Sequence, residues 1–285
     1  MMSRYFVDRI SRRLALCFGT VAFLILIFIA VFILKGSLPA LGEIGVADIL
    51  FSTEWYPSHG AFGIFTMFAG SVVVTILALA IAVPLAVGCA IFLAEVAPCR
   101  IGNMARPAIE LLVGIPSVVY GLVGMIVLCP AIAHLSGTGS GSSVLAAAIV
   151  LAIMVLPTIT SISEDSLRAV PTLYKEGALA LGATHWQAVY HVLLPAARRG
   201  IVAAVVLGTG RAIGETMAMV MVIGNSPILP TSIFAPARTL TGNIASEIGA
   251  ATGMHESTLF VTGLVLFVLI MAINSVGLLL NRRKK

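Results

Sequence analysis

Two charged residues, Arg211 and Glu215, interrupt an otherwise uncharged and mostly apolar stretch that runs from residue 201 to residue 223. A guanidinium at the centre of a bilayer costs about 2.5–3.5 kcal/mol on insertion scales, so it is expected to face a polar pathway or a partner. A guanidinium also donates two parallel hydrogen bonds to an oxyanion. The stretch therefore predicts a transporter for an anion, which Arg211 contacts during passage.

Glu215 shares a helix face with Arg211 if residues 201–224 form one helix, since side chains four positions apart are neighbours. We expect Glu215 to hold Arg211 in place while the pathway is empty. It would also prevent tight binding of the anion, which would slow release. Gly208 and Gly214 flank this face and would let a ligand or another helix approach closely. The alternative is a buried ion pair that only joins helices.

Hydroxyl side chains in the apolar runs are weaker candidates for lining the pathway. Threonine in a membrane helix commonly bonds to a carbonyl of its own helix instead. The five histidines show no metal-ligand spacing, and we find no Walker lysine motif, nucleophile elbow or metalloprotease motif. We therefore expect no metal, no cofactor and no catalytic residue, and no ATP hydrolysis by this chain. The hydroxyl candidates are Thr209, Thr216, Ser117 and Tyr120.

The composition of the chain indicates an integral membrane protein. Hydrophobic residues make up 59% of the 285 residues and charged residues only 10%, against about 25% charged in soluble domains. The apolar runs are far longer than strands, so we expect an all-α protein with six transmembrane helices. The expected spans are residues 14–34, 64–94, 108–133, 143–163, 201–224 and 258–281.

The distribution of Lys and Arg predicts which side of the membrane each loop faces. All of these residues except Lys35, Arg238 and the intramembrane Arg211 fall in segments on the side of the N-terminus. Positive charge accumulates on the cytoplasmic side, so both termini are expected in the cytoplasm. The basic tail at 282–285 is expected to contact the inner leaflet.

The loop at about 164–200 predicts two short helices with a sharp bend between them. Pro171 can open the first helix and Gly182 can close it. Thr184 and Gln187 form a capping-box pattern for a second helix that is expected to stop before Pro195. Neither helix could span a bilayer, so each needs a partner surface or the membrane interface. The alternative is a hairpin that only braces the bundle.

The same loop resembles the EAA loop of ABC importer permeases. Glu176-Gly-Ala is followed by Gly182, then by Val192 and by Leu194-Pro195, at the spacing of the family pattern. The chain departs from that pattern at Gly177 and Val192, both mild changes. In the family this loop is a coupling helix that docks on the ATP-binding subunit. The resemblance implies this role for Glu176, Gly177, Ala178, Gly182 and Ala183.

Two further stretches resemble the permeases of the phosphate-specific transport (Pst) system. They are Gly114-Ile-Pro-Ser-Val-Val-Tyr-Gly121 and Gly210-Arg-Ala-Ile-Gly-Glu-Thr-Met-Ala218, and the second is most like the PstC-type subunit. The resemblance implies a type I ABC importer permease core with one extra N-terminal helix, in the inner membrane of a bacterium. It also implies four kinds of partner: a PstA-like second permease, a PstB-like dimer of ATP-binding subunits, a PstS-like periplasmic phosphate-binding protein, and inorganic phosphate itself. Membrane lipid surrounds the chain, and no nucleic acid is expected.

The leading hypothesis is thus a non-catalytic permease subunit of an ATP-driven phosphate importer, which forms half of the pathway. Its alternatives are the sister PstA-type permease, an importer of another oxyanion, an ion-coupled secondary transporter with Glu215 as a proton relay, and a scaffold without a pathway. The expected organisation has three parts. Residues 1–63 form the cytoplasmic tail, first helix and outer loop, residues 64–281 the permease domain, and residues 282–285 the tail.

Overall fold

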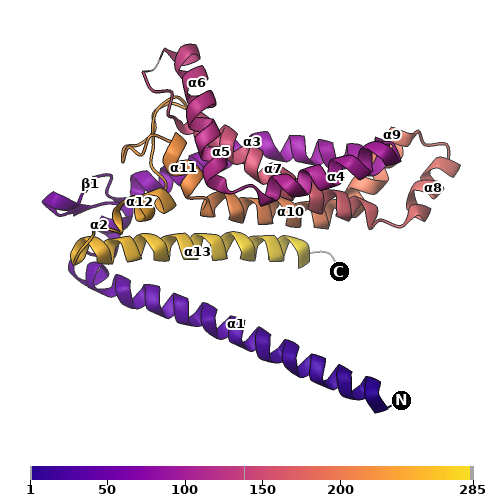
Figure 1. The fold of residues 1–285 in the computed structure, drawn as a ribbon, viewed down its shortest axis with the longest axis horizontal. Helices are drawn as coiled ribbons and strands as arrows, with labels where there is room; N and C mark the ends of the chain where they lie inside the picture. The colour runs from indigo at the N-terminus through magenta and orange to yellow at the C-terminus, as the bar shows by residue number, and fades with distance from the viewer. Residues whose placement is uncertain (1, 138, 283–285) are drawn as a thin grey trace.

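Six helices are long and apolar enough to cross a membrane in the computed structural model, which describes residues 2–137 and 139–282. The chain is an all-α membrane protein, as predicted, with the N-terminal helix in addition to the permease core (Figure 1). The spans are built from α1 (Met2–Glu43), α3 (Phe65–Ile91) with its π-helical end η2 (Phe92–Val96), α5 (Ser117–Val123) through η3 (Gly124–Leu128) to α6 (Cys129–Ser136), α7 (Val144–Arg168), α9 (His185–Ala188) through η4 (Val189–Leu193) to α10 (Leu194–Gly214), and α13 (Met254–Arg282).

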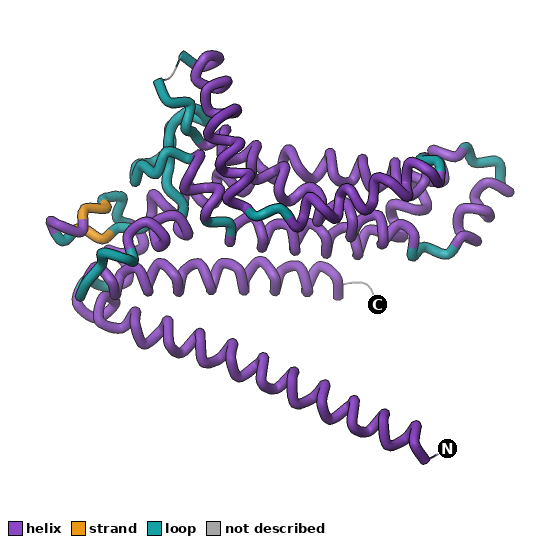
Figure 2. The backbone as a smooth tube through the Cα atoms, in the orientation of Figure 1, coloured by secondary structure: helices purple, strands orange, loops and turns teal. Residues whose placement is uncertain are grey.

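Shorter elements complete the chain and gather mainly at the two ends of the bundle. They are α2 (Val46–Phe51), β1 (Trp55–Tyr56), η1 (Pro57–His59), β2 (Ala61–Phe62), α4 (Cys99–Gly114), α8 (Thr172–Ala180), α11 (Met217–Val222) and α12 (Leu240–Glu247). The start of α1, the end of α13 and α8 lie at one end, here called the terminal end, whereas the β1–β2 hairpin, α2 and α12 lie at the opposite, hairpin end (Figures 1 and 2). Residues 283–285 of the expected basic tail lie outside the described residues.

The core of the bundle is the packing of α3 and α10 on α7. Small side chains such as Ala82, Ala86 and Ala147 are fully buried there, which lets the helix backbones approach closely. Gly208 on α10 belongs to this contact, because a Cβ at that position would come within 2.7 Å of Ile159 on α7. Of the two expected roles of Gly208, close approach of a ligand or of another helix, the structure shows the second, with α7 as the helix.

The third predicted span is broken in its first third, between α4 and α5. Ile115 is extended, with φ of −68° and ψ of 128°, and Pro116 caps the start of α5. A proline disfavours helical backbone in the residue before it and offers no N–H to the preceding turn, so the run splits at this point. The prediction of one continuous helix over 108–133 is wrong in this respect.

The fifth predicted span is also broken, and it begins earlier than expected. α10 ends at Gly214, Glu215 is extended with ψ of 131°, and α11 then begins at Met217. At its other end the helix runs without a stop through Pro195, so the expected short helix that ends before this proline is not formed. The π turn η4 directly precedes Pro195 and shifts the hydrogen-bond register, which lets the helix pass the proline.

The structure confirms the first short helix, the bend and the capping box that were predicted for the loop at about 164–200. Pro171 caps α8, Gly182 forms the bend with φ of 87°, and Thr184 and Gln187 make both hydrogen bonds of the capping box. Only a residue without a Cβ adopts this backbone at little cost, so Gly182 sets the bend.

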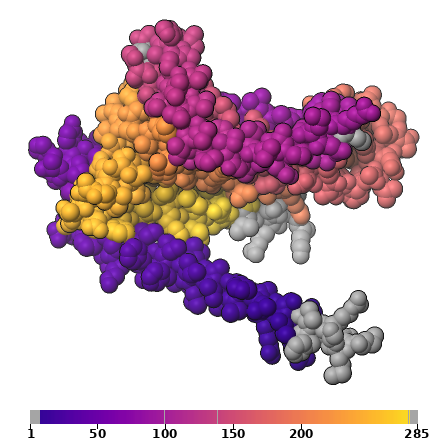
Figure 3. Space-filling model, viewed as in Figure 1, coloured from indigo at the N-terminus to yellow at the C-terminus, as the bar shows by residue number. Residues whose placement is uncertain are grey.

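The helix α1 is longer than predicted, and the contacts of its described side chains with the rest of the chain lie near the hairpin end. The Phe32 ring packs edge-on against Phe260 of α13 at 5.7 Å, and the Ser257 hydroxyl donates to the Gly36 carbonyl at 2.7 Å. Toward its start, α1 diverges from the bundle (Figures 1 and 3). No residue in its most apolar stretch is buried by the rest of the described chain.

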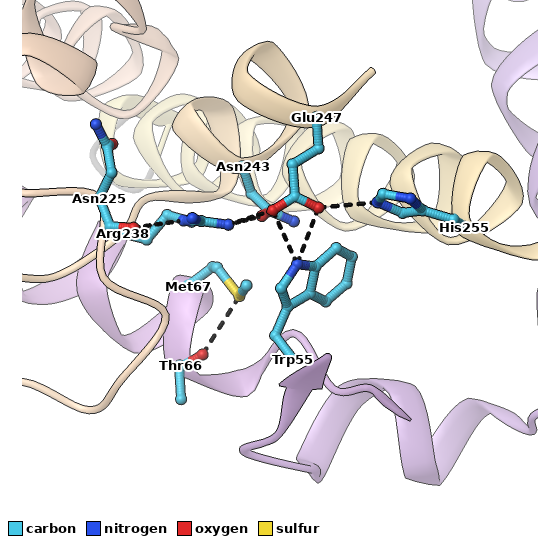
Figure 4. Close-up of polar contacts among 8 residues, drawn as sticks. All are labelled: Trp55, Thr66, Met67, Asn225, Arg238, Asn243, Glu247 and His255. Carbon is cyan, nitrogen blue, oxygen red and sulfur yellow. Dashed lines mark hydrogen bonds and ion pairs between the residues drawn. The ribbon is translucent and has the colours of Figure 1, made fainter. Parts of the chain in front are cut away.

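One carboxylate ties the segments of the hairpin end together. Glu247 of α12 accepts hydrogen bonds from Arg238, from His255 of α13 at 2.8 Å, and from the Trp55 indole of β1 at 3.0 and 3.1 Å (Figure 4). Arg238 also donates to the Asn225 carbonyl at 2.9 Å. These contacts, here called the Glu247 cluster, join the first loop of the hairpin end to the last.

Candidate functional site

Arg211 lies in the last turn of α10, just before the break at Glu215. Its side chain is half-buried and donates from Nη1 to the Thr158 hydroxyl of α7 at 2.9 Å. Among the residues that the structure describes, no carboxylate lies within ion-pair distance of Arg211. The guanidinium therefore keeps its positive charge uncompensated and most of its donors available.

Glu215 does not hold Arg211, in contrast to the expected pair. Its Oε1 accepts from the backbone N–H groups of Thr216 at 3.0 Å and Ala218 at 3.3 Å, so the carboxylate caps the start of α11. A carboxylate at a helix start satisfies donors that have no partner within the helix. The helix break that the sequence reasoning missed is what separates the two charges. The Glu215 carbonyl is held in turn by the Thr241 hydroxyl of α12 at 2.9 Å.

The two broken helices lie together, with α5 packed on α11. A Cβ at Gly121 would come within 2.9 Å of the Ala218 backbone, so glycine is needed for this close approach. Tyr120 of α5 lies close enough to Arg211 to interact with it electrostatically, and its hydroxyl donates across the break to the Leu112 carbonyl at 2.9 Å. The break at Glu215 lies four residues from Arg211, and Tyr120 bridges the break at Ile115. Irregular backbone in a membrane is expected only against protein or a polar cavity.

The remaining hydroxyl candidates lie near this site but are differently engaged. Thr209 donates to the Val205 carbonyl of its own helix at 2.8 Å, and Thr216 donates to the Gly214 carbonyl at 3.2 Å. Ser117 is half-buried in the first turn of α5. Thr158 was missed from the sequence, because a threonine within an apolar run gives no sign that a distant arginine will reach it.

The side of α10 next to Arg211 is open in this chain. A Cβ at Gly210 or Gly214 would meet no other atom within 4 Å beyond its own helix and neighbours. Arg211 thus borders a surface that another subunit or a ligand can approach. Among the described residues, no three or more His, Cys, Asp or Glu side chains come together in a group that could hold a metal ion. The chemistry offered is hydrogen bonding to an anion from a fixed guanidinium.

The residues predicted to contact the ATP-binding subunit lie at the terminal end, in the segment from Pro171 to Ala188 that contains α8 and α9, here called the α8–α9 loop. Glu176, Gly177 and Gly182 are exposed, and Ala178 and Ala183 are half-buried. Apolar side chains on this loop are also exposed to a high degree, with Leu181 91% and Leu173 72% exposed. These residues lie beyond the end of α7, so the loop offers an apolar surface outside the bundle.

The comparisons with known proteins agree on the class of this chain. The model of the family described as "Binding-protein-dependent transport system inner membrane component" matches residues 85–285. A probable ABC transporter permease protein of Bacillus subtilis, YqgH, is 48% identical over 231 residues, covering 79% of this chain and 75% of the relative. The phosphate transport system permease protein PstC of Xylella fastidiosa is 39% identical, covering 90% of this chain and 85% of the relative. PstC of Pasteurella multocida is 33% identical, covering 99% and 94%.

Solved structures share the fold. An amino acid ABC transporter matches with a TM-score of 0.57 and 19% identity, covering 78% of this chain and 94% of the other. The MetNI methionine ABC transporter in an inward-facing conformation matches with a TM-score of 0.57 and 22% identity, covering 77% and 93%. At these identities the likeness concerns the fold alone.

Proposed function

Because the chain belongs to the family of binding-protein-dependent transport system inner membrane components, a family of multi-pass membrane proteins, we propose that it is the PstC-type permease subunit of an ATP-driven inorganic phosphate importer. It forms half of the translocation pathway and hydrolyses no ATP itself. The relatives named PstC, which match over most of this chain, support phosphate as the cargo.

One observation carries the proposal: the guanidinium of Arg211 has no acidic partner among the described residues and borders an open surface of α10 next to the break at Glu215. A cation inside a membrane protein is expensive unless something compensates it. A passing phosphate supplies that compensation, and the planar fork of Arg211 suits its oxygens. Glu215, Thr216, Thr209, Ser117 and Tyr120 surround or brace this point and are proposed as its neighbours in the pathway.

Three protein partners complete the proposed importer. A PstA-like permease covers the open side of α10, and a PstS-like binding protein delivers phosphate at the hairpin end. A PstB-like dimer of ATP-binding subunits binds the exposed loop that contains Glu176–Gly182. The 91% exposure of Leu181 supports this last contact, because a large apolar side chain at such a position is usually covered by a partner.

The proposed orientation has the terminal end in the cytoplasm and the hairpin end in the periplasm. The start of α1, the end of α13 and α8 lie together at one end, which agrees with an even number of crossings (Figure 1). Residues 64–281 are proposed as the permease domain, with residues 1–63 as an added helix and loop. Most of the family model's match, residues 85–285, falls within this proposed domain.

The test is transport by the purified complex in liposomes. We expect ATP inside and loaded phosphate-binding protein outside to drive uptake of labelled phosphate. Unlabelled phosphate should compete, whereas sulfate, molybdate and tungstate should not. Uptake of another oxyanion in preference to phosphate would overturn the cargo. Uptake that continues without the ATP-binding subunit would instead indicate an ion-coupled transporter.

A further inference from the structure

A series of charged contacts begins on α8 and runs into the bundle at the terminal end. The Lys175 ammonium of α8 bonds the Glu95 carboxylate of η2, the π-helical end of α3. Two residues earlier, the Leu93 carbonyl of η2 accepts from Nη2 of Arg168, the last residue of α7, at 2.7 Å. η2 is therefore held from both sides, by α8 and by α7.

The series continues through a buried carboxylate. Glu164 of α7 has a side chain only 5% exposed, and its Oε1 accepts from Nε of Arg168 at 2.9 Å and from Nε of Arg106 at 2.7 Å. Arg106 comes from α4, the first half of the broken helix. A buried carboxylate requires such partners, since an unpaired charge there is costly. Lys175, Glu95, Arg168, Glu164 and Arg106 are here called the ionic chain.

The far end of α4 reaches the candidate pathway. α4 stops at the Ile115–Pro116 break, and the Tyr120 hydroxyl of α5 bonds back to Leu112 near the end of α4. Tyr120 is also close enough to Arg211 for the two side chains to interact electrostatically. The loop proposed to bind the ATPase is thus joined to the site proposed to bind phosphate by direct contacts: from α8 to η2, to α7, to α4 and to Tyr120.

We propose that the ionic chain makes α4 move with α8, so that movement of the ATP-binding subunits shifts the break beside Arg211. This inference rests on the proposed function, because it takes α8 as the docking helix. The two carboxylates of the ionic chain are largely buried, and charge-assisted hydrogen bonds to them are short and directional, so they hold the elements that they join in a fixed relative position. Arg106 and Lys175 act here as positioning residues, since neither contacts the cargo.

The test measures movement of α4 directly in the assembled complex. Spin labels are placed at Met104 on α4 and Val268 on α13, which are 77% and 57% exposed, after replacement of the native cysteines. ATP binding should change the distance between the labels in the wild-type protein. Arg106→Ala should abolish the change, and phosphate moved per ATP hydrolysed should fall about tenfold, a typical coupling between two sites. Glu164 keeps Arg168 in this variant, so folding is preserved.

Two controls make the result specific. Arg100→Ala removes an exposed arginine of the same helix and should leave the distance change intact. Lys175→Glu places like charges together and should abolish the change, whereas Lys175→Glu combined with Glu95→Lys restores the pair and the change. Persistence of the change in Arg106→Ala, its absence from the wild-type complex, or failure of the reciprocal swap would overturn the inference. The distance change requires ATP but no phosphate, so a wrong cargo would leave it intact.

Discussion

Most hydrogen-bond donors of Arg211 remain available because Glu215 caps α11 instead of pairing with Arg211. If the two side chains paired, the Arg211 guanidinium would have to release the Glu215 carboxylate each time it bound an anion. Instead Glu215 is engaged by two backbone N–H groups, and the contact that the structure gives Arg211 is a neutral hydroxyl. A hydroxyl orients the guanidinium without neutralising it. If Arg211 binds the anion as proposed, release would depend on movement of the surrounding helices rather than on competition by Glu215.

Removal of the Arg211 charge should abolish most transport. Hydrogen bonds to a charged group contribute about 1.5–3 kcal/mol, so Arg211→Gln should lower the initial rate of phosphate uptake roughly 10- to 150-fold. Arg211→Lys keeps the charge but loses the planar fork, so its loss should be smaller. Initial rates in liposomes measure both. The exposed Arg100→Gln is the matched control, and a wild-type rate for Arg211→Gln would exclude the assigned role.

Glu215 variants separate a helix cap from an ion pair. Glu215→Gln keeps an oxygen that accepts from the Thr216 and Ala218 N–H groups, whereas Glu215→Ala removes it. Loss of a cap costs about 0.5–2 kcal/mol, so the alanine variant should unfold at a lower temperature and the glutamine variant close to the wild type. Thermal unfolding of the purified protein in detergent measures this. Equal loss in both variants would indicate that the charge of Glu215, rather than its cap, stabilises the protein.

Among the elements, the α8–α9 loop carries the clearest prediction about partners. Leu181 projects almost fully from the bend at Gly182, beyond the end of the bundle. Leu181→Glu should weaken binding of the ATP-binding subunit, because a carboxylate must be desolvated where a leucine was buried. Copurification of the two subunits in detergent is the measurement. Leu135→Glu, at an 85% exposed leucine of α6, is the control and should copurify normally. Equal retention of the ATPase by both variants would reject docking at this bend.

The Glu247 cluster predicts how the first and last loops of the hairpin end stabilise each other. Glu247→Gln removes the negative charge of the carboxylate that Arg238 and His255 contact. Trp55 can still donate to the amide oxygen of the glutamine. Arg238 is largely buried, so an uncompensated guanidinium should lower the thermal midpoint of unfolding by several degrees. Glu256→Gln, at an exposed glutamate of the same end, should have no effect. An unchanged midpoint in Glu247→Gln would contradict this structural role.

The sequence predicted the elements whose signals are local and missed those set by contacts between helices. Long apolar runs specify the six spans, and Pro171, Gly182 and Thr184 specify α8 and its bend, because each acts within one turn. The breaks at Ile115 and Glu215 were not predicted. A proline is tolerated in many membrane helices, and a glutamate signals a cap only where the helix has already ended. The contact of Arg211 with Thr158 spans 53 positions, so no pattern along the chain could indicate it.

At the scale of the whole molecule, the two ends of the bundle differ in the partners that each is proposed to meet. The terminal end combines the α8–α9 loop with most of the arginines and lysines, and the hairpin end carries β1, β2 and α12. Positive charge is retained on the cytoplasmic side during insertion. The orientation proposed for the importer therefore follows from charge, and the docking of the ATPase follows from the orientation.

This orientation predicts opposite labelling of single cysteines at the two ends. In a background without Cys17, Cys89, Cys99 and Cys129, a cysteine at the exposed Ser58 of the hairpin end should react with a membrane-impermeant maleimide added outside spheroplasts. A cysteine at Leu181 should react only after the membrane is opened. Because the start of α1, the end of α13 and α8 share one end, labelling of Leu181→Cys from outside would reverse the assignment of every loop. The ATPase could then no longer reach the loop proposed to bind it, and the importer hypothesis would fail with the orientation.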